Sequence, residues 1–254
     1  MRKPGMLSKL AAAGATFTFD DAKRISNLTH GSLKNLLHRL ESEGWIERIE
    51  RGKYILIPLG AEKGEYTLNE FVIGSMLVQP YCISYWSALH YHGFTEQIPS
   101  TVFVQTTARK KKRNIDVFGV GYKIIRVTEK KFFGFDKVWF NDIQISISDK
   151  EKTVIDCLDR PNNCGGLVEV AKAIKSESLD KARLSDYAKR ISNSGVIRRL
   201  GYLAEYYGID GIELPRIDAR NYLRLDPGLP AEGTKSGKWR LVVNVKEKTL
   251  GGIE

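Results

Sequence analysis

The sequence TFDDAKRISNLTHGSLKNLLHRLESEGWIERIERGKYILIP, residues 18–58, holds two helix-length segments followed by two short alternating segments. Thr18 and Thr29 each precede one of the helical segments, where a threonine hydroxyl can accept a hydrogen bond from a free backbone N–H group. The pattern predicts helices over 19–26 and 30–43, with three residues between them. This spacing is typical of a helix-turn-helix.

The second predicted helix has one apolar face and one polar face. Its leucines recur at helical spacing on one side, and polar residues point away from them. The leucines are Leu33, Leu36, Leu37 and Leu40, and the outward residues include Asn35, His38 and Ser42. An asparagine on an exposed helix can pair with adenine through two hydrogen bonds, so this face suits a recognition helix in the major groove of DNA.

Two strands are predicted after Gly44, over 45–50 and 53–57, with Arg51 and Gly52 forming a tight turn between them. The basic residues Arg48, Arg51 and Lys53 would line this hairpin. Two helices followed by a basic hairpin predict a winged helix-turn-helix. The alternative is an amphipathic helix pair that supports a larger domain, with its basic residues merely solvated.

The composition predicts more than one domain and an anionic partner. The chain has 254 residues, with 40 Lys and Arg against 30 Asp and Glu, a net charge of +10. A chain of this length can form two cores, and an excess of positive charge favours nucleic acid or an acidic protein surface. The excess per residue is higher in the first 60 residues, which hold ten basic and six acidic residues.

Cysteine usage and hydropathy predict a soluble, cytoplasmic protein. The three cysteines, Cys82, Cys157 and Cys164, lack CxxC spacing and accompany only four histidines. They indicate neither a disulfide framework nor a zinc site. The longest apolar run, 71–78, is far shorter than a membrane span, and no secretory signal begins the sequence. We expect no metal, no cofactor and no membrane partner.

The chain divides after the hairpin. Residues 58–64 combine proline, glycine and charge, as a linker does. We therefore predict a DNA-binding domain over 1–60, a mixed α/β domain over 61–210 and an extension over 211–254 that either docks on the domain or stays mobile. The fold class is α+β.

Strands are predicted in the middle of the second domain, with helices around them. Predicted strands cover 101–107, 122–127, 138–140 and 143–147, and predicted helices cover 68–77, 84–93, 149–158, 167–175, 181–191 and 195–207.

Three segments of the second domain carry a family resemblance: ISYWSALHYHGF at 83–94, DKEKTVIDCL at 149–158 and RRLGYL at 198–203. Following a winged helix in this order, they resemble the AbiEi family of antitoxins and transcriptional regulators from type IV toxin–antitoxin, abortive-infection systems of phage defence. The resemblance covers about residues 5–210, and nothing is carried over beyond Asp210.

The resemblance implies a division of labour between the domains. In the family the winged helix binds inverted repeats in its own promoter and represses it, and the second domain counters a nucleotidyltransferase toxin of the AbiEii type without a requirement for direct contact. Family members are not enzymes, so no catalytic residue is expected. The DNA contacts implied for this sequence are Ser32, Lys34, Asn35, His38 and Arg39 on the helix and Arg48, Arg51 and Lys53 on the wing.

Further basic residues are candidates for an antitoxin surface or for contacts to flanking DNA. They are Arg109, Lys110, Lys111, Lys112 and Arg113 in a predicted loop, and Arg198 and Arg199 within the predicted helix over 195–207. Five adjacent cations repel one another unless an anionic partner approaches. The alternatives are a solvated hairpin tip for the run, and internal pairing for the two arginines.

Ser84, His90 and His92 lie together in one predicted helix, but two histidines two apart cannot face the same way, so we interpret it as a core helix capped by Ser84.

Two rival functions remain open. Asp116 followed by Glu129, Lys130 and Lys131 has the acid, acid-x-lysine order of Mg²⁺-dependent nucleases. A winged helix joined to an aromatic-rich α/β domain also fits a regulator that senses a small ligand.

Overall fold

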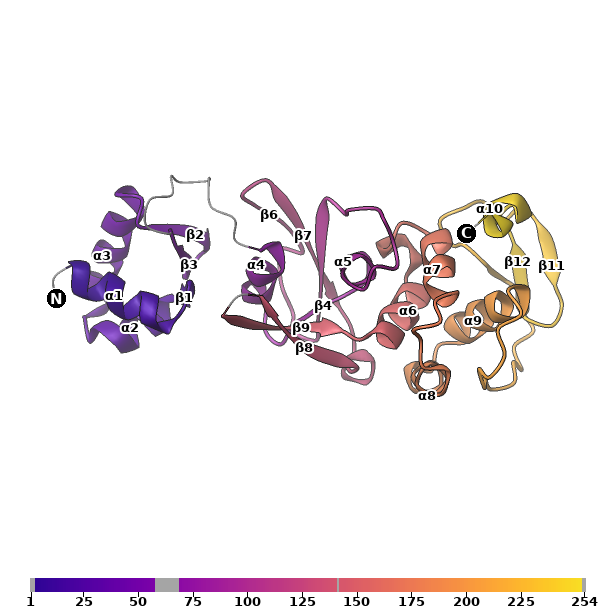
Figure 1. The fold of residues 1–254 in the computed structure, drawn as a ribbon. Coiled ribbons are helices and arrows are strands. Elements are labelled where there is room, and N and C mark those ends of the chain that lie inside the picture. Colours follow the sequence, from indigo (N-terminus) through magenta and orange to yellow (C-terminus); the bar gives the residue numbers. More distant parts are fainter. Residues whose placement is uncertain (1–2, 58–68, 141, 253–254) are drawn as a thin grey trace.

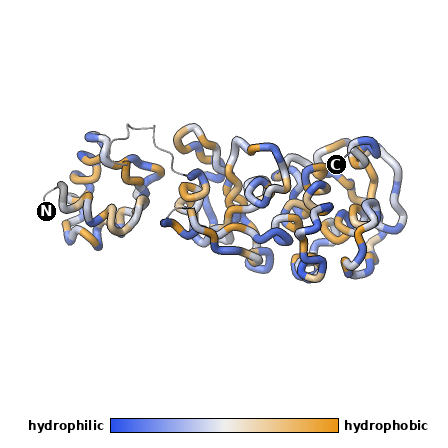
Figure 2. Tube along the Cα trace, in the orientation of Figure 1, coloured by the Kyte–Doolittle hydropathy of each residue, from blue (hydrophilic) through white to orange (hydrophobic). Residues whose placement is uncertain are grey.

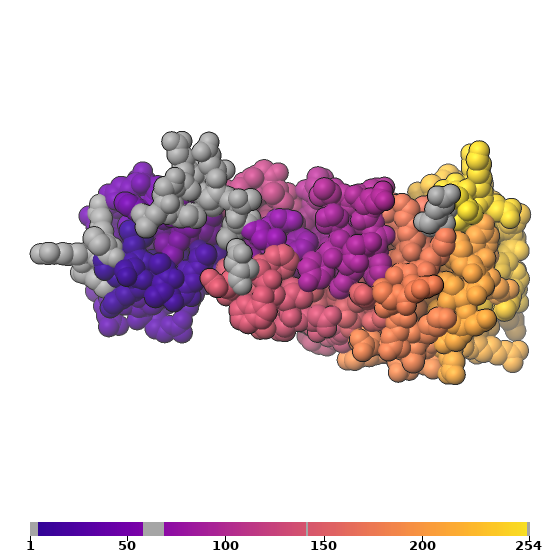
Figure 3. All heavy atoms as spheres, in the orientation of Figure 1, coloured from indigo at the N-terminus to yellow at the C-terminus, as the bar shows by residue number. Residues whose placement is uncertain are grey.

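The computed structural model describes residues 3–57, 69–140 and 142–252. The molecule is elongated, with an N-terminal unit at one end and the last strands and helix at the other (Figure 1). The surfaces of the N-terminal unit and of the central part of the chain touch (Figure 3). The mixed α+β class is confirmed. The predicted linker at 58–64 lies outside the described residues.

The N-terminal unit has the winged-helix order of elements. These are α1 (Lys3–Ala13), β1 (Thr16–Thr18), α2 (Phe19–Ser26), α3 (His30–Ser42), β2 (Ile46–Glu50) and β3 (Lys53–Leu56). The predicted helix pair and hairpin are confirmed, whereas α1 and β1 were not predicted. β1 pairs with β3, so three short strands form one sheet with β3 in the centre.

Local hydrogen bonds fix where α2 and α3 begin. The Thr18 hydroxyl accepts from the backbone N–H of Asp21, and the Asp21 carboxylate accepts from the Thr18 N–H, which together form a capping box. Thr29 caps α3 through the N–H of Ser32. The four leucines of α3 are buried against Met6, Leu10 and Phe17. The sequence of α3 therefore buries one face and exposes the other.

The wing strands alternate between two cores. Tyr54 faces the core of the N-terminal unit. Ile49 and Ile55 instead belong to the same buried apolar cluster as Phe71 and Val78 of the second unit, which comprises the described residues from 69 onward. Because side chains alternate along a strand, one face of the hairpin supports the helices and the other packs on the second unit. Hydrophobic residues recur along the trace in both units (Figure 2).

A six-stranded mixed sheet forms the centre of the second unit, in the order β6-β7-β5-β4-β9-β8. Its strands are β4 (Cys82–Ile83), β5 (Thr101–Thr106), β6 (Asn114–Val117), β7 (Val120–Arg126), β8 (Phe135–Phe140) and β9 (Ile143–Ser148). The predicted hairpin of β8 and β9 is confirmed. The strands predicted at 101–107 and 122–127 exist, but they run parallel because β6, which was not predicted, intervenes.

Helices cover both faces of this sheet. On one face lies α4 (Glu70–Leu77), whose Gly74 approaches Ile83 and Val104 so closely that a Cβ would come 3.1 Å from the first and 3.3 Å from the second. The opposite face carries α5 (Trp86–Tyr91), which packs on β5 and on α6 (Lys150–Asp159). In turn α7 (Leu167–Ile174), α8 (Lys181–Ile191) and α9 (Ser194–Tyr206) pack on α6. Two short 3-10 helices, η1 (Glu129–Lys131) and η2 (Pro161–Asn163), lie between these elements.

The predicted cap of α5 is wrong. Ser84 does not begin the helix, because Cys82 and Ile83 pair within the sheet and Ser84 directly follows them. Its hydroxyl donates to the carbonyl oxygen of Cys82 at 3.2 Å. The helix begins at Trp86, after Tyr85, which has a φ of 57° and a fully buried side chain.

The segment after Asp210 docks on α9. It contains β10 (Leu223–Arg224), β11 (Thr234–Ser236), β12 (Leu241–Val243) and α10 (Glu247–Gly251). The three strands form a small sheet, and the Trp239 indole lies over Gly201 of α9 while its N–H donates to the Glu205 carboxylate at 2.6 Å. Of the two alternatives for this segment, the structure shows the docked one.

Gly201→Ala should loosen this segment. A Cβ at residue 201 would overlap the indole ring of Trp239, so the ring must leave its place. Overpacking of this kind costs about 1–3 kcal/mol. We expect faster hydrogen exchange at the amides of β12 in this variant. Gly237→Ala is the matched control because a Cβ there meets no atom within 4 Å. Equal exchange in the two variants would contradict the role of the Trp239 contact.

No helix in the described parts of the chain is long and apolar enough to cross a membrane.

Candidate nucleic-acid interface

The outward face of α3 is polar and exposed. All five residues implied as DNA contacts on this helix are exposed: Ser32, Lys34, Asn35, His38 and Arg39. Local hydrogen bonds engage two parts of the face, since Thr29 donates to Ser32 Oγ at 3.0 Å and the Ser42 hydroxyl donates to the His38 carbonyl oxygen at 2.9 Å. The Asn35 side chain has no hydrogen-bond partner among the described residues. Both the carbonyl oxygen and the NH2 group of its side chain are therefore available to an external ligand.

The turn of the wing lies beside the N-termini of both helices. The Phe19 N–H at the start of α2 donates to the Gly52 carbonyl oxygen at 2.8 Å. The Phe19 ring contacts the ring of His30, the first residue of α3, with 4.9 Å between centroids. The exposed His30 therefore lies next to the wing turn, although it was absent from the predicted contacts. The sequence marks it only as a helix start, because its contact to Phe19 depends on the tertiary fold.

The three basic residues of the wing differ in their surroundings. Arg48 and Arg51 are exposed. Lys53 instead directs its ammonium group toward the second unit, donating to the Leu77 carbonyl oxygen at 2.9 Å and to the Glu50 carboxylate at 3.2 Å. Lys53 thus fastens the wing to the C-terminal end of α4.

The basic run after β5 meets the wing at the same point. Lys110 donates to both carboxylate oxygens of Glu50, at 2.8 and 2.9 Å, and to the Leu77 carbonyl oxygen at 2.6 Å. Burial raises the pKa of Glu50, but the hydrogen bonds and charges of Lys110 and Lys53 outweigh it, so the pKa lies below its ordinary value. The other members of the run, Arg109, Lys111, Lys112 and Arg113, are exposed.

Glu50→Ala should release the wing from the second unit. Without the carboxylate, the ammonium groups of Lys53 and Lys110 remain together at the Leu77 carbonyl oxygen. A lost hydrogen bond to a charged group costs about 1.5–3 kcal/mol, and partial exposure places this case near the lower limit. We expect faster hydrogen exchange at the amides of β2 and β3.

Low pH should also release the wing from the second unit in the wild-type protein. The pKa of Glu50 is lower in the folded protein than in the unfolded chain, so its contact with the two lysines stabilises the fold at pH values above the unfolded pKa. This stabilisation is lost as the pH falls through the pKa of folded Glu50.

The exposed Glu96→Ala is the matched control for Glu50→Ala. Indistinguishable exchange rates for the two variants would exclude Glu50 as the fastening residue.

Arg198 and Arg199 are buried, which corrects the expectation that they belong to an exposed surface. Arg198 donates to the carbonyl oxygens of Asn221 and Arg240, and Arg199 donates to those of Leu225, Leu158 and Arg224. Their exposed fractions are 0% and 7%. The guanidinium groups hold the segment after Asp210 on α9, which is the internal pairing named as the alternative.

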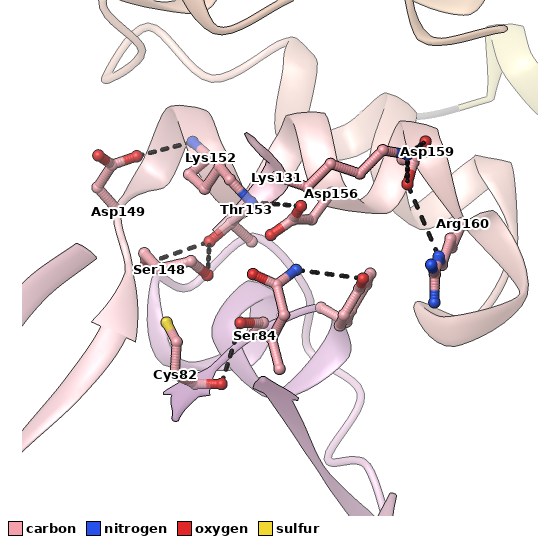
Figure 4. Close-up of polar contacts among 12 residues, drawn as sticks. Cys82, Ser84, Lys131, Ser148, Asp149, Lys152, Thr153, Asp156, Asp159 and Arg160 are labelled. Atoms are coloured by element: carbon pink, nitrogen blue, oxygen red, sulfur yellow. Dashed lines mark hydrogen bonds and ion pairs between the residues drawn. The ribbon is translucent and has the colours of Figure 1, made fainter. Parts of the chain in front are cut away.

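A buried polar cluster surrounds α6. Figure 4 shows the Lys152 ammonium group directed at the Asp156 carboxylate, and the two atoms are 2.5 Å apart. Both side chains are almost completely buried. The hydroxyls of Ser148 and Thr153 bond each other at 2.8 Å beside them. Asp149 caps α6 through the N–H of Lys152, and Asp149, Glu151 and Lys152 are all buried.

Gln105 can complete this cluster. Its Nε2 contacts the Tyr85 hydroxyl at 3.2 Å, while its Oε1 and the Asp156 Oδ2 are both buried without a hydrogen-bond partner among the described residues. Turning the amide by 180° would let its nitrogen donate to Asp156 and its oxygen accept from Tyr85. Gln105 lies close enough to lower the pKa of Asp156, although burial has the larger, opposite effect and raises it. The cluster then satisfies itself internally.

Lys131, the lysine of the acid-x-lysine pattern in the nuclease alternative, forms an ion pair outside that pattern. Lys131 donates to both carboxylate oxygens of Asp159, at 2.7 and 2.8 Å (Figure 4). Asp116 is exposed on β6. Within the described ranges, no group of three or more His, Cys, Asp or Glu residues is arranged to hold a metal ion.

Comparison with known families confirms the resemblance in the N-terminal unit. Residues 6–57 match the family described as "Transcriptional regulator, AbiEi antitoxin". The match runs from α1 to the end of the wing and therefore contains all of the exposed face described above. It supports a regulatory or antitoxin role for the chain. No curated protein matches the chain.

Among solved structures, the chain is similar to the RV2827C protein from Mycobacterium tuberculosis. The TM-score is 0.61, the sequence identity is 12%, and the match covers 94% of this chain and 92% of that one. At this identity the similarity shows a shared fold. It extends over both units, beyond the 6–57 range of the family match.

Proposed function

We propose that this chain is a DNA-binding transcriptional autorepressor and the antitoxin of a type IV toxin–antitoxin system. The winged helix binds inverted repeats in the promoter of its own gene. The second unit counters a nucleotidyltransferase toxin of the AbiEii type, and this role does not require direct contact with the toxin. The chain acts in the cytoplasm and is not an enzyme.

The observation that carries the proposal is the exposed polar face of α3 beside the wing turn, within the residues that match the AbiEi family. Asn35 has both amide groups available and suits adenine, and His38 can reach another base edge. Ser32, Lys34 and Arg39 flank them on the same exposed side. These side chains can therefore read bases in a major groove.

Arg48 and Arg51 take the positioning role on the wing. Exposed guanidinium groups bind phosphate oxygens and fix the register of a protein on a duplex without reading sequence. Lys53 has a different role in the proposal, because its ammonium group already bonds Glu50 and Leu77. It keeps the wing in place rather than contacting DNA.

A reporter experiment tests the regulatory part. The DNA upstream of the reading frame is fused to a reporter gene, and the full chain is supplied from a second promoter. We expect the wild-type chain to lower reporter output several-fold. Lys246→Ala/Lys248→Ala, which removes two exposed cations from the opposite end of the molecule, should repress equally well. Unchanged reporter output with the wild-type chain would contradict autorepression.

A growth experiment tests the antitoxin part. The adjacent reading frame is expressed with and without this chain, and we expect growth arrest only in its absence. A variant that no longer binds the promoter should still restore growth when it is expressed from an unrelated promoter. Arrest that persists with the wild-type chain would contradict the antitoxin role.

A further inference from the structure

We infer that the basic loop, defined as residues 109–113 together with Arg126, is a second DNA-binding site that holds backbone phosphates flanking the segment read by α3. The inference rests on the proposed DNA-binding function and extends it to a surface of the second unit. The winged helix alone supplies the base contacts in this arrangement.

The basic loop lines an open hollow of about 860 Å³. Its lining residues are Arg109, Lys110, Lys111, Arg113, Asn114 and Arg126. The lining thus combines cations with one neutral amide and contains no carboxylate. A concave surface of one charge sign concentrates counter-ions of the opposite sign, so the ligand of this hollow is an anion.

Most of the positive charge in the hollow is uncompensated. Lys110 is paired with Glu50, but among the described residues Arg109, Lys111 and Arg113 have no acidic partner. The loop is nevertheless held in place, because the Arg113 carbonyl oxygen accepts from the Ile124 N–H at 2.7 Å and Arg126 Nε donates to the Thr107 carbonyl oxygen at 3.0 Å. The backbone at the end of the loop and the Arg126 side chain are therefore positioned before any ligand binds.

The hollow is connected to the recognition helix by direct contacts. Lys110 bonds Glu50, which directly precedes the wing turn at Arg51 and Gly52. The Gly52 carbonyl oxygen bonds the Phe19 N–H, and Phe19 packs on His30 at the start of α3. A duplex seated on α3 and the wing turn consequently passes the basic loop.

The shape of the hollow favours a DNA backbone over a small free anion. A site for a small ligand usually encloses most of the ligand surface. This hollow is open, and its cations follow one another along a loop. Double-stranded DNA presents a negative charge about every 1.7 Å along its axis, so a row of cations beside the wing can meet several phosphates.

The test compares two duplexes and two variants of the full chain. One duplex is trimmed to the segment that the winged helix protects, and the other carries added flanks of unrelated sequence. Lys111→Ala/Arg113→Ala removes two cations from the hollow, and Lys246→Ala/Lys248→Ala removes two from the far end of the molecule. Both pairs are charge-matched. Dissociation constants are measured at several salt concentrations.

We expect Lys111→Ala/Arg113→Ala to bind the long duplex about tenfold or more weakly, and to lower the slope of log K against log salt by about 1–2, because each phosphate contact contributes about 0.9. The trimmed duplex should bind all proteins alike. Equal binding of the long duplex by the two variants would overturn the inference, as would an equal loss on both duplexes.

Sodium tripolyphosphate distinguishes a free anion from DNA. Micromolar binding of tripolyphosphate that is lost in Lys111→Ala/Arg113→Ala, with unchanged binding of the long duplex, would overturn the DNA assignment. Failure of the proposed function gives a different result. If the wild-type chain shows no preference for upstream over scrambled DNA, but the variant still loses affinity for long duplexes, the phosphate site stands and the promoter-specific function fails.

Discussion

Asp156→Ala is expected to lower the free energy of unfolding of the second unit by about 3–5 kcal/mol, since this is the usual cost of removing one partner of a buried ion pair. Lys152 and Asp156 have exposed side-chain fractions of 0% and 2%, with 2.5 Å between the charged atoms. Without Asp156, the contact that remains to the Lys152 ammonium group within the described parts of the chain is the Phe133 ring, at 5.0 Å from its centroid. One aromatic ring cannot replace a carboxylate.

Hydrogen exchange at the amides of α6 measures this loss of stability within the second unit. The measurement does not require the two units to unfold in a single transition. Asp186→Ala, at an exposed position of α8, is the control and should change exchange little. Lys152→Met/Asp156→Leu removes both charges and should recover much of the stability. A loss below about 1 kcal/mol for Asp156→Ala would show that the ion pair is not a stabilising centre of the unit.

Asn35→Ala/Arg51→Ala is expected to weaken binding to the promoter about 100-fold or more. An asparagine paired with adenine contributes about 1–3 kcal/mol of discrimination, and a phosphate contact adds a sequence-independent term. Both side chains are exposed and neither supports the core, so the variant should fold like the wild type. Circular dichroism and equilibrium binding to the upstream duplex measure the two properties.

The matched control for this variant is Asn162→Ala/Arg216→Ala, which changes the same residue types at exposed positions of the second unit. It should bind the promoter like the wild-type chain. The single variants separate the two roles, since Asn35→Ala should reduce the preference for operator over scrambled DNA and Arg51→Ala should weaken both. Full promoter affinity in the double variant would exclude α3 and the wing turn as the DNA-reading elements.

The winged helix could be predicted because its signals are local. Thr18, Thr29 and the spacing of the leucines in α3 act within a few residues, and the structure confirms the elements that they define. The match of residues 6–57 to the AbiEi family also confirms the resemblance within this unit. The exposed residues of the candidate interface follow from the same periodicity, whereas their contacts to DNA stay a prediction.

The remaining features depend on contacts between residues far apart in the sequence. Lys110 and Glu50 are 60 positions apart, and Arg199 bonds the carbonyl oxygen of Leu225, 26 positions away. Sequence patterns predict that a basic residue is exposed, because the neighbouring residues do not indicate a hydrogen-bond or ion-pair partner that lies far away in the sequence. β6 was missed for a related reason, since its four residues are too few to show an alternating pattern and its place follows from pairing with β7.

The most direct measurement is the equilibrium binding of the full chain to fluorescently labelled DNA from immediately upstream of its reading frame, with scrambled DNA of equal length, at two salt concentrations. We predict that the upstream duplex binds about 10³-fold or more tightly than the scrambled one, and that both weaken as salt rises. Equal affinity for the two duplexes at both salt concentrations would contradict a sequence-specific regulator.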